Sequence, residues 1–141
     1  MPTSGEGRFA ADTSVAVAAL DASHAAHLAC RRRVIETDAT LAGHAAFETF
    51  SVLTRMPGVL RLDAPTAHAA ILAAFPEISP LDGTATVDLF RRLGAVGLTG
   101  GAVYDALVGE AARRDERVLL TRDRRAARTY DLLGVTWEYV E

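Results

Sequence analysis

The segment Phe9-Ala10-Ala11-Asp12-Thr13-Ser14-Val15 sets a carboxylate between a short apolar run and the apolar pattern that follows it. It predicts a buried strand that turns directly into a helix, and ligands of α/β proteins bind beyond the carboxyl ends of such strands. Asp12 then has two interpretations. It is a helix cap that accepts a hydrogen bond from the first turn, or it is a carboxylate that handles a metal or a phosphate. The segment alone favours the cap.

The same arrangement returns near the C-terminus of the chain. The apolar run Arg117–Thr121 has the length of a strand, it is followed by Asp123, and a helix is expected to about Leu132. Further strands are predicted at 36–42 and at 135–140, the latter at a sheet edge, with a strand-like connector at 76–80. Helices are predicted at 13–20, 24–33, 43–56, 66–75, 85–93 and 102–114, and a glycine-rich loop at 94–101. Strands separated by helices predict a parallel α/β sheet.

The bulk properties fit one domain with one core. The 141 residues are 50% hydrophobic, and we expect residues 8–141 to form a single domain after a polar tail, residues 1–7. No stretch is long and apolar enough for a membrane span, and the tail lacks the features of a signal peptide. The single Cys30 excludes an internal disulfide and fits a reducing compartment. The expected location is therefore the cytoplasm, with no membrane partner.

Charge limits how the chain could bind nucleic acid. The net charge is −3, so a broad basic face is not expected, and a nucleic acid would have to be attracted by local arginines or bound cations. All basic residues are arginine, which excludes a phosphate loop because that motif requires lysine. The spacing of His24, His27 and Cys30 on one predicted helix permits a metal site, but an exposed helix stripe explains it as well.

Two further acids lie within predicted helices. In the 102–114 helix, Asp105 shares a face with Val108, Gly109 and Ala112, so it projects from the packing side and should be paired, protonated or bound to a metal. In the 43–56 helix, Glu48 lies off the apolar stripe, and periodicity predicts a solvated face for it. That stripe consists of Ala46, Phe47, Phe50 and Leu53, and we expect it in the core, with parts of it available to a partner surface instead.

Carboxylates brought together in this way repel one another and raise each other's pKa. Asp12 and Asp123 should share one rim of the sheet, within reach of Asp105 and Glu48. Such a cluster persists when a divalent cation neutralises it, and Mg²⁺ and Mn²⁺ prefer oxygen ligands. The cation would also activate a water for hydrolysis.

Four segments of the chain together resemble the PIN-domain ribonucleases, most closely the VapC toxins of bacterial toxin–antitoxin pairs. They are 9–15, Phe47–Pro57, Tyr104–Leu107 and Leu119–Arg124, in the order and spacing of that family. The resemblance implies a three-layer α/β/α fold with a central, mainly parallel sheet. It further implies Mg²⁺- or Mn²⁺-dependent endonucleolytic cleavage of RNA, restrained by a VapB-like antitoxin, and a homodimer.

The resemblance also assigns residues. The family's acidic metal-binding and catalytic quartet corresponds to Asp12, Glu48, Asp105 and Asp123. This reverses the interpretation of Glu48 that periodicity favours. The resemblance also implies that Thr13 and Thr121 lie close to that site. Apart from the resemblance, Arg122 and Arg124 flank the Asp123 end of the site, and they are candidates for contacts with RNA phosphates, which a guanidinium fits well. For any one of the arginines Arg122, Arg124, Arg125 and Arg128, a solvated helix face is favoured over a phosphate contact.

Two other classes of function stay open at this point. A non-catalytic interaction module could retain the fold, although all four acids are present. A phosphoryl-accepting α/β domain, such as a receiver or a haloacid-dehalogenase-like phosphatase, resembles the strand–aspartate–helix pattern but calls for a lysine that this chain lacks.

Overall fold

The structure is a computed structural model that describes residues 7–141, so nearly all of the predicted polar tail lies outside the described part. The strands are β1 (Phe9–Ala11), β2 (Thr40–Ala42), β3 (Ile78–Ser79), β4 (Val118–Thr121) and β5 (Trp137–Tyr139). The helices are α1 (Thr13–Leu20), α2 (His27–Thr37), α3 (Ala45–Thr54), α4 (Ala64–Ala74), α5 (Gly83–Val96), α6 (Ala102–Arg114) and α7 (Arg124–Leu133), with a short 3-10 turn at Gly58–Leu60. Within residues 7–141 no helix combines the length and apolarity needed to cross a bilayer.

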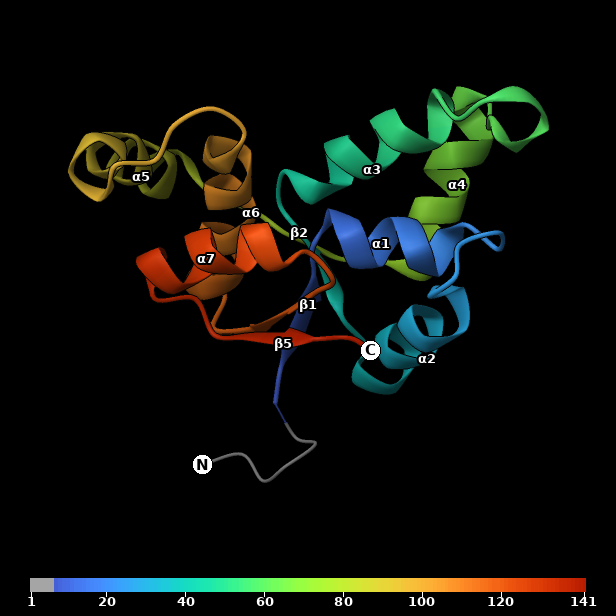
Figure 1. Ribbon diagram of the computed structural model, residues 1–141, viewed down its shortest axis with the longest axis horizontal. Coiled ribbons are helices and arrows are strands. Elements are labelled where there is room, and N and C mark those ends of the chain that lie inside the picture. The colour runs from blue at the N-terminus through green and yellow to red at the C-terminus, as the bar shows by residue number, and fades with distance from the viewer. Residues whose placement is uncertain (1–6) are drawn as a thin grey trace.

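The five strands form one parallel sheet in the order β3-β2-β1-β4-β5. Figure 1 shows the sheet between two groups of helices, α1 to α4 on one side and α5 to α7 on the other. The predicted three-layer α/β/α fold with a parallel sheet is confirmed. Strands β1 and β2 are fully buried and β4 nearly so, because helices cover both faces of the sheet. The edge strand β5 is only half-buried.

Several predicted boundaries were wrong, most clearly around β2. The second helix starts at His27 and runs to Thr37, so the predicted strand at 36–42 shrinks to Thr40–Ala42. Val34 is buried against the core, so the packing face of this helix continues past the predicted helix end at residue 33. The helix ends where Asp38 adopts the left-handed conformation, with φ of 48°. Likewise α5 continues to Val96, so the predicted loop at 94–101 begins at Gly97.

The strand order defines where a ligand can bind. From β1 the chain crosses to β2 on one side, whereas β4 lies on the other side of β1, so the carboxyl ends of β1 and β4 flank the point at which the order reverses. Here the backbone N–H of Asp12 donates to the Leu120 carbonyl at 3.0 Å. Asp12 and Asp123, which follow these two strands, therefore share one rim, as predicted.

Candidate active site

The four predicted acids line one cavity of about 270 Å³ at this rim. Asp12 and Asp123 are the N-caps of α1 and α7, while Glu48 and Asp105 lie in the first turns of α3 and α6. Each acid thus sits at a helix N-terminus, where partial positive charge favours a carboxylate. The complete lining is Asp12, Thr13, Ser14, Glu48, Asp105, Val108, Asp123, Ala126 and Tyr130.

Asp12 is the most firmly held of the four, with 3% of its surface exposed. Its Oδ1 accepts hydrogen bonds from Ser14 Oγ at 2.6 Å and from the Val15 N–H at 3.2 Å. Its Oδ2 accepts one from the Tyr130 hydroxyl at 2.9 Å. The predicted cap is confirmed, and because the side chain also borders the cavity, the cap does not exclude a second role. Burial raises the pKa of Asp12 although these donors lower it in part.

Ser14 and Tyr130 are contacts of Asp12 that the sequence reasoning missed. Ser14 Oγ also accepts from the backbone N–H of Arg122 at 2.8 Å, so it joins the end of β1 to the residue after β4. Tyr130 is buried among the apolar residues of α7. A signal existed for it, since a tyrosine in an apolar helix stripe requires a hydrogen-bond partner for its hydroxyl. Together the two residues fix the orientation of the Asp12 carboxylate.

Gly109 on α6 has no side chain, which lets the Tyr130 ring pack directly against this helix. A Cβ at Gly109 would lie 2.9 Å from Tyr130 Cδ1 and 3.2 Å from Val135 Cγ2. We expect Gly109→Ala to lower the free energy of unfolding by about 1–3 kcal/mol through overpacking, although alanine is the better helix former. Equilibrium unfolding in urea, compared between wild type and Gly109→Ala, measures this difference in free energy.

Gly94→Ala in α5 is the matched control, since no atom lies within 4 Å of a Cβ there. It should be neutral or stabilising by up to about 1 kcal/mol. Equal stability of the two variants would show that the Tyr130 ring does not pack tightly on α6.

Glu48 lies in the cavity rather than on a solvated face, so the prediction from periodicity was wrong. The residue is half-buried, and its Oε1 accepts a hydrogen bond from Thr13 Oγ1 at 3.2 Å. A helical wheel describes one helix in isolation, whereas α3 packs against α1, which brings its first turn to the rim. The same limitation affected Phe47, which was expected in the core and is 73% exposed.

Asp105 projects from the packing side of α6, as predicted, with Val108, Gly109 and Ala112 buried on that face. Burial and the negative charges of Asp123, Glu48 and Asp12 raise the pKa of Asp105 to about 6. Asp123 is exposed, and its Oδ1 accepts from the N–H groups of Arg125 and Ala126. The cluster therefore carries the mutual repulsion expected of carboxylates without a counter-charge.

The donor set suits a hard divalent cation. All candidate ligands are carboxylate or hydroxyl oxygens, which Mg²⁺ and Mn²⁺ prefer over nitrogen or sulfur. Within the described residues, no three His, Cys, Asp or Glu side chains surround a common point closely enough to ligate one ion directly. One or two carboxylates with bridging waters, the usual arrangement for Mg²⁺, fits this spacing. His24, His27 and Cys30 form no such group either, and Cys30 is fully buried.

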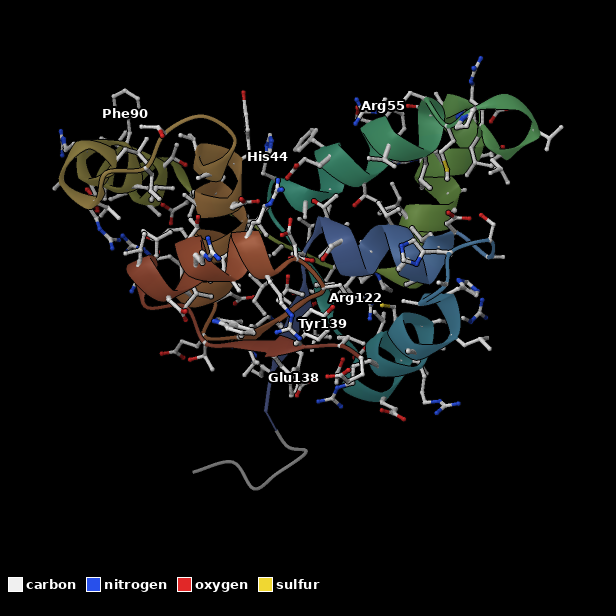
Figure 2. All side chains as sticks on the ribbon, in the orientation of Figure 1. His44, Arg55, Phe90, Arg122, Glu138 and Tyr139 are labelled. Atoms are coloured by element: carbon white, nitrogen blue, oxygen red, sulfur yellow. The ribbon has the colours of Figure 1, made fainter. Side chains whose placement is uncertain are left out.

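The four residues predicted near the substrate differ in position. Thr13 lines the cavity, whereas Thr121 does not; it is buried at the end of β4, where its Oγ1 accepts from the Asp123 N–H at 3.0 Å. Arg122 donates to the Val140 carbonyl at 2.6 Å and lies over the Tyr139 ring, while Arg124 lies 4.0 Å above the same ring. Figure 2 shows Arg122 beside Tyr139 at β5. Neither arginine lines the cavity, and their contact with RNA stays a prediction.

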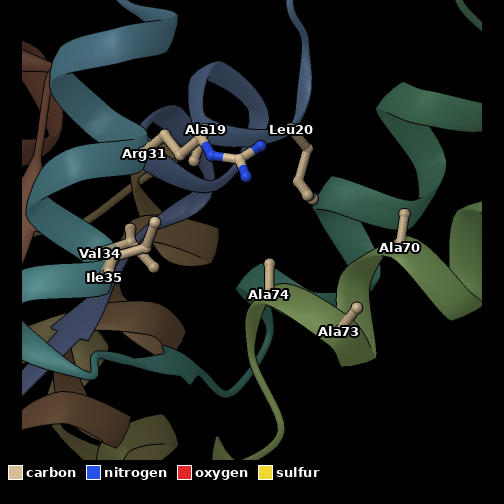
Figure 3. Close-up of a pocket in the computed structure, with 8 residues that line it drawn as sticks. All are labelled: Ala19, Leu20, Arg31, Val34, Ile35, Ala70, Ala73 and Ala74. Atoms are coloured by element: carbon tan, nitrogen blue, oxygen red, sulfur yellow. The ribbon is translucent and has the colours of Figure 1, made fainter.

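A second depression lies away from the acids, between α1, α2 and α4. The volume of this groove is about 310 Å³. Figure 3 shows the side chains that line it, which are apolar except for Arg31. Its lining consists of Ala19, Leu20, Arg31, Val34, Ile35, Ala70, Ala73 and Ala74. Ile35 is exposed, so the outer wall of the groove offers apolar surface to a partner.

Comparison with known proteins agrees with this geometry. The family model described as PIN domain matches residues 10–132. The chain is 44% identical over 127 residues to ribonuclease VapC27 of Mycobacterium tuberculosis, an alignment that covers 90% of this chain and 93% of that protein. It is also 44% identical over 134 residues to ribonuclease VapC40 of the same species, covering 94% of this chain and 98% of that protein. The fold, the acid-lined cavity and these matches together establish that the chain belongs to the PIN domain family.

Proposed function

We infer that the chain is a PIN-domain endoribonuclease of the VapC type, the toxin of a toxin–antitoxin pair. Its membership of the PIN family and its similarity to two ribonucleases over nearly their whole length support the activity. The observation that carries the chemistry is the convergence of Asp12, Glu48, Asp105 and Asp123 on one cavity. We propose that these acids hold Mg²⁺ or Mn²⁺.

The bound cation would screen the charge of the scissile phosphate and lower the pKa of the attacking water. Asp12, with both oxygens oriented by hydrogen bonds, is the proposed principal ligand, and Asp105 and Asp123 complete the acidic wall. Glu48 is the proposed acceptor of the proton that the water loses, and the hydrogen bond from Thr13 to its Oε1 supports this role by orienting the carboxylate. The water oxygen would add to phosphorus while one P–O bond to ribose breaks. The departing ribose oxygen would take a proton from solvent, which leaves a phosphomonoester and a hydroxyl.

The test is cleavage of a mixed RNA pool by the purified chain, followed by mapping of the new ends. We expect defined fragments with Mg²⁺ or Mn²⁺ and none in excess chelator, because the acids alone cannot neutralise the phosphate charge. Cleavage that persists in chelator would contradict the metal mechanism. Absence of cleavage with either metal, combined with tight binding of a protein partner, would favour a non-catalytic interaction module.

A VapB-like antitoxin is the proposed partner, in keeping with the VapC names of the relatives. The apolar groove between α1, α2 and α4 is the surface we propose for it, since Ile35 on its outer wall offers exposed apolar area. A homodimer in solution stays a prediction, which the mass of the purified chain decides.

A further inference from the structure

Three rings lie beside residues that line the acid cavity, and none of the three belongs to the hydrophobic core. Phe47 directly precedes Glu48, and Tyr104 directly precedes Asp105; these two aromatic side chains are 73% and 53% exposed. His44 lies between them, stacked on Tyr104 with ring centroids 5.4 Å apart and 6.3 Å from the Phe47 centroid. We call His44, Phe47 and Tyr104 the aromatic ledge. Figure 2 shows His44 where α3 approaches α6.

A hollow of about 300 Å³ adjoins the ledge and continues the acid cavity. Thr13 and Glu48 line both, while His44 and Phe47 line the hollow alone. A molecule in the hollow would therefore contact Thr13 and Glu48, which also line the proposed cleavage centre.

The far end of the hollow carries a positive charge. Arg55 lines it, and within residues 7–141 its guanidinium forms no ion pair or side-chain hydrogen bond. By contrast, Arg33, Arg113 and Arg117 are all engaged by carboxylates. Arg55 is thus available for an anion, and a phosphate diester is the anion that an RNA chain would bring there.

We propose that the aromatic ledge binds an unpaired nucleobase of single-stranded RNA next to the scissile phosphate, with Arg55 contacting a neighbouring phosphate. This rests on the proposed ribonuclease function and deepens it. Recognition of single-stranded RNA relies on bases that stack on aromatic side chains, and such stacking is tolerant of sequence. Because a duplex keeps its bases stacked internally, the ledge selects unpaired RNA.

The direct test measures RNA binding separately from cleavage. Fluorescence anisotropy of a labelled single-stranded RNA is recorded with Mg²⁺ on chains that carry Asp12→Asn, so that the RNA stays intact. We expect Phe47→Ala in this background to weaken binding roughly 10- to 100-fold, the loss of one base stack. Phe90→Ala is the matched control, since Phe90 on α5 is 75% exposed and lies on neither the ledge nor the hollow. It should leave the affinity unchanged.

Two further arms identify the occupant. With a series of RNAs that each lack one base, a single abasic position next to the cleavage point should remove the difference in affinity between the Phe47→Ala chain and its parent. Arg55→Ala should reduce the slope of log affinity against log salt by about 1, the effect of one phosphate contact.

Other outcomes overturn the proposal. Equal affinities of the Phe47→Ala and Phe90→Ala chains, or a loss that is the same for intact and abasic RNAs, would exclude base stacking. A fall in native mass on Phe47→Ala with unchanged affinity per chain would make the ledge an interface between copies of this chain. Wild-type cleavage alongside any of these results would leave the ribonuclease function standing, whereas no metal-dependent cleavage by wild type would defeat that function instead.

Discussion

Replacing Asp12 by asparagine should reduce RNA cleavage on the order of a thousandfold, the size expected when one preorganised charge partner of the transition state is lost. Asparagine keeps the shape and the capping ability of the side chain, so α1 remains capped. It removes only the negative charge that Ser14, Val15 and Tyr130 orient toward the cavity. Initial rates of cleavage with Mn²⁺, compared between wild type and variant, measure the effect.

Stability provides the control for this variant. Because burial raises the pKa of Asp12, the ionised form costs the folded state free energy at neutral pH. In metal-free buffer Asp12→Asn should therefore melt at the same temperature as wild type or above it. Asp12→Ala should be equally inactive but lose about 1 kcal/mol of stability with the cap. An active Asp12→Asn chain would contradict the role given to Asp12.

The second large effect concerns the stability of the fold, which should depend on pH and on divalent metal because of the ionisation of Asp105. Its pKa is about 6 in the folded chain, against an ordinary value of 3.8 for an aspartate in water, so between these values the folded state binds more protons than the unfolded state. The contribution of Asp105 to stability therefore falls as pH rises from about 4 to about 6 and stays low above that. Asp105→Asn removes this loss, and it should melt a few degrees above wild type at pH 7.5 in chelator.

Divalent metal should reverse that order. Mg²⁺ or Mn²⁺ binds the folded state through the ionised acids, so it raises the melting temperature of wild type more than that of Asp105→Asn. Differential scanning calorimetry of both chains at pH 4.5 and 7.5, with metal and with chelator, gives the comparison. Identical profiles of melting temperature against pH for the two chains would show that the fold does not raise the pKa of Asp105.

The parallel sheet and the positions of Asp12 and Asp123 could be predicted because they depend on local patterns. An apolar run, a carboxylate and a helix start appear together in the sequence at β1 and again at β4. Asp105 was also predictable from its own helix, since the buried residues Val108 and Ala112 share its face.

Glu48, Phe47, Ser14 and Tyr130 depend on contacts between elements, which periodicity does not contain. The wheel of α3 placed Glu48 in solvent and Phe47 in the core, and the structure shows the opposite because α3 packs beside α1. The resemblance to PIN-domain ribonucleases placed Glu48 with the other acids, but it gave no indication of the Tyr130 hydrogen bond to Asp12, which spans 118 positions of sequence. Long-range hydrogen bonds of this kind become visible only in the fold.

The proposed ribonuclease activity depends on acids from four separate elements that converge to hold a divalent cation. An anomalous difference map from crystals soaked in Mn²⁺ would locate that cation. We expect one or two peaks in the acid cavity, with Asp12 oxygens at a direct ligand distance of about 2.0–2.6 Å or joined through water. An empty cavity at saturating Mn²⁺, or a peak at another place in a chain that still cleaves RNA, would contradict this proposal.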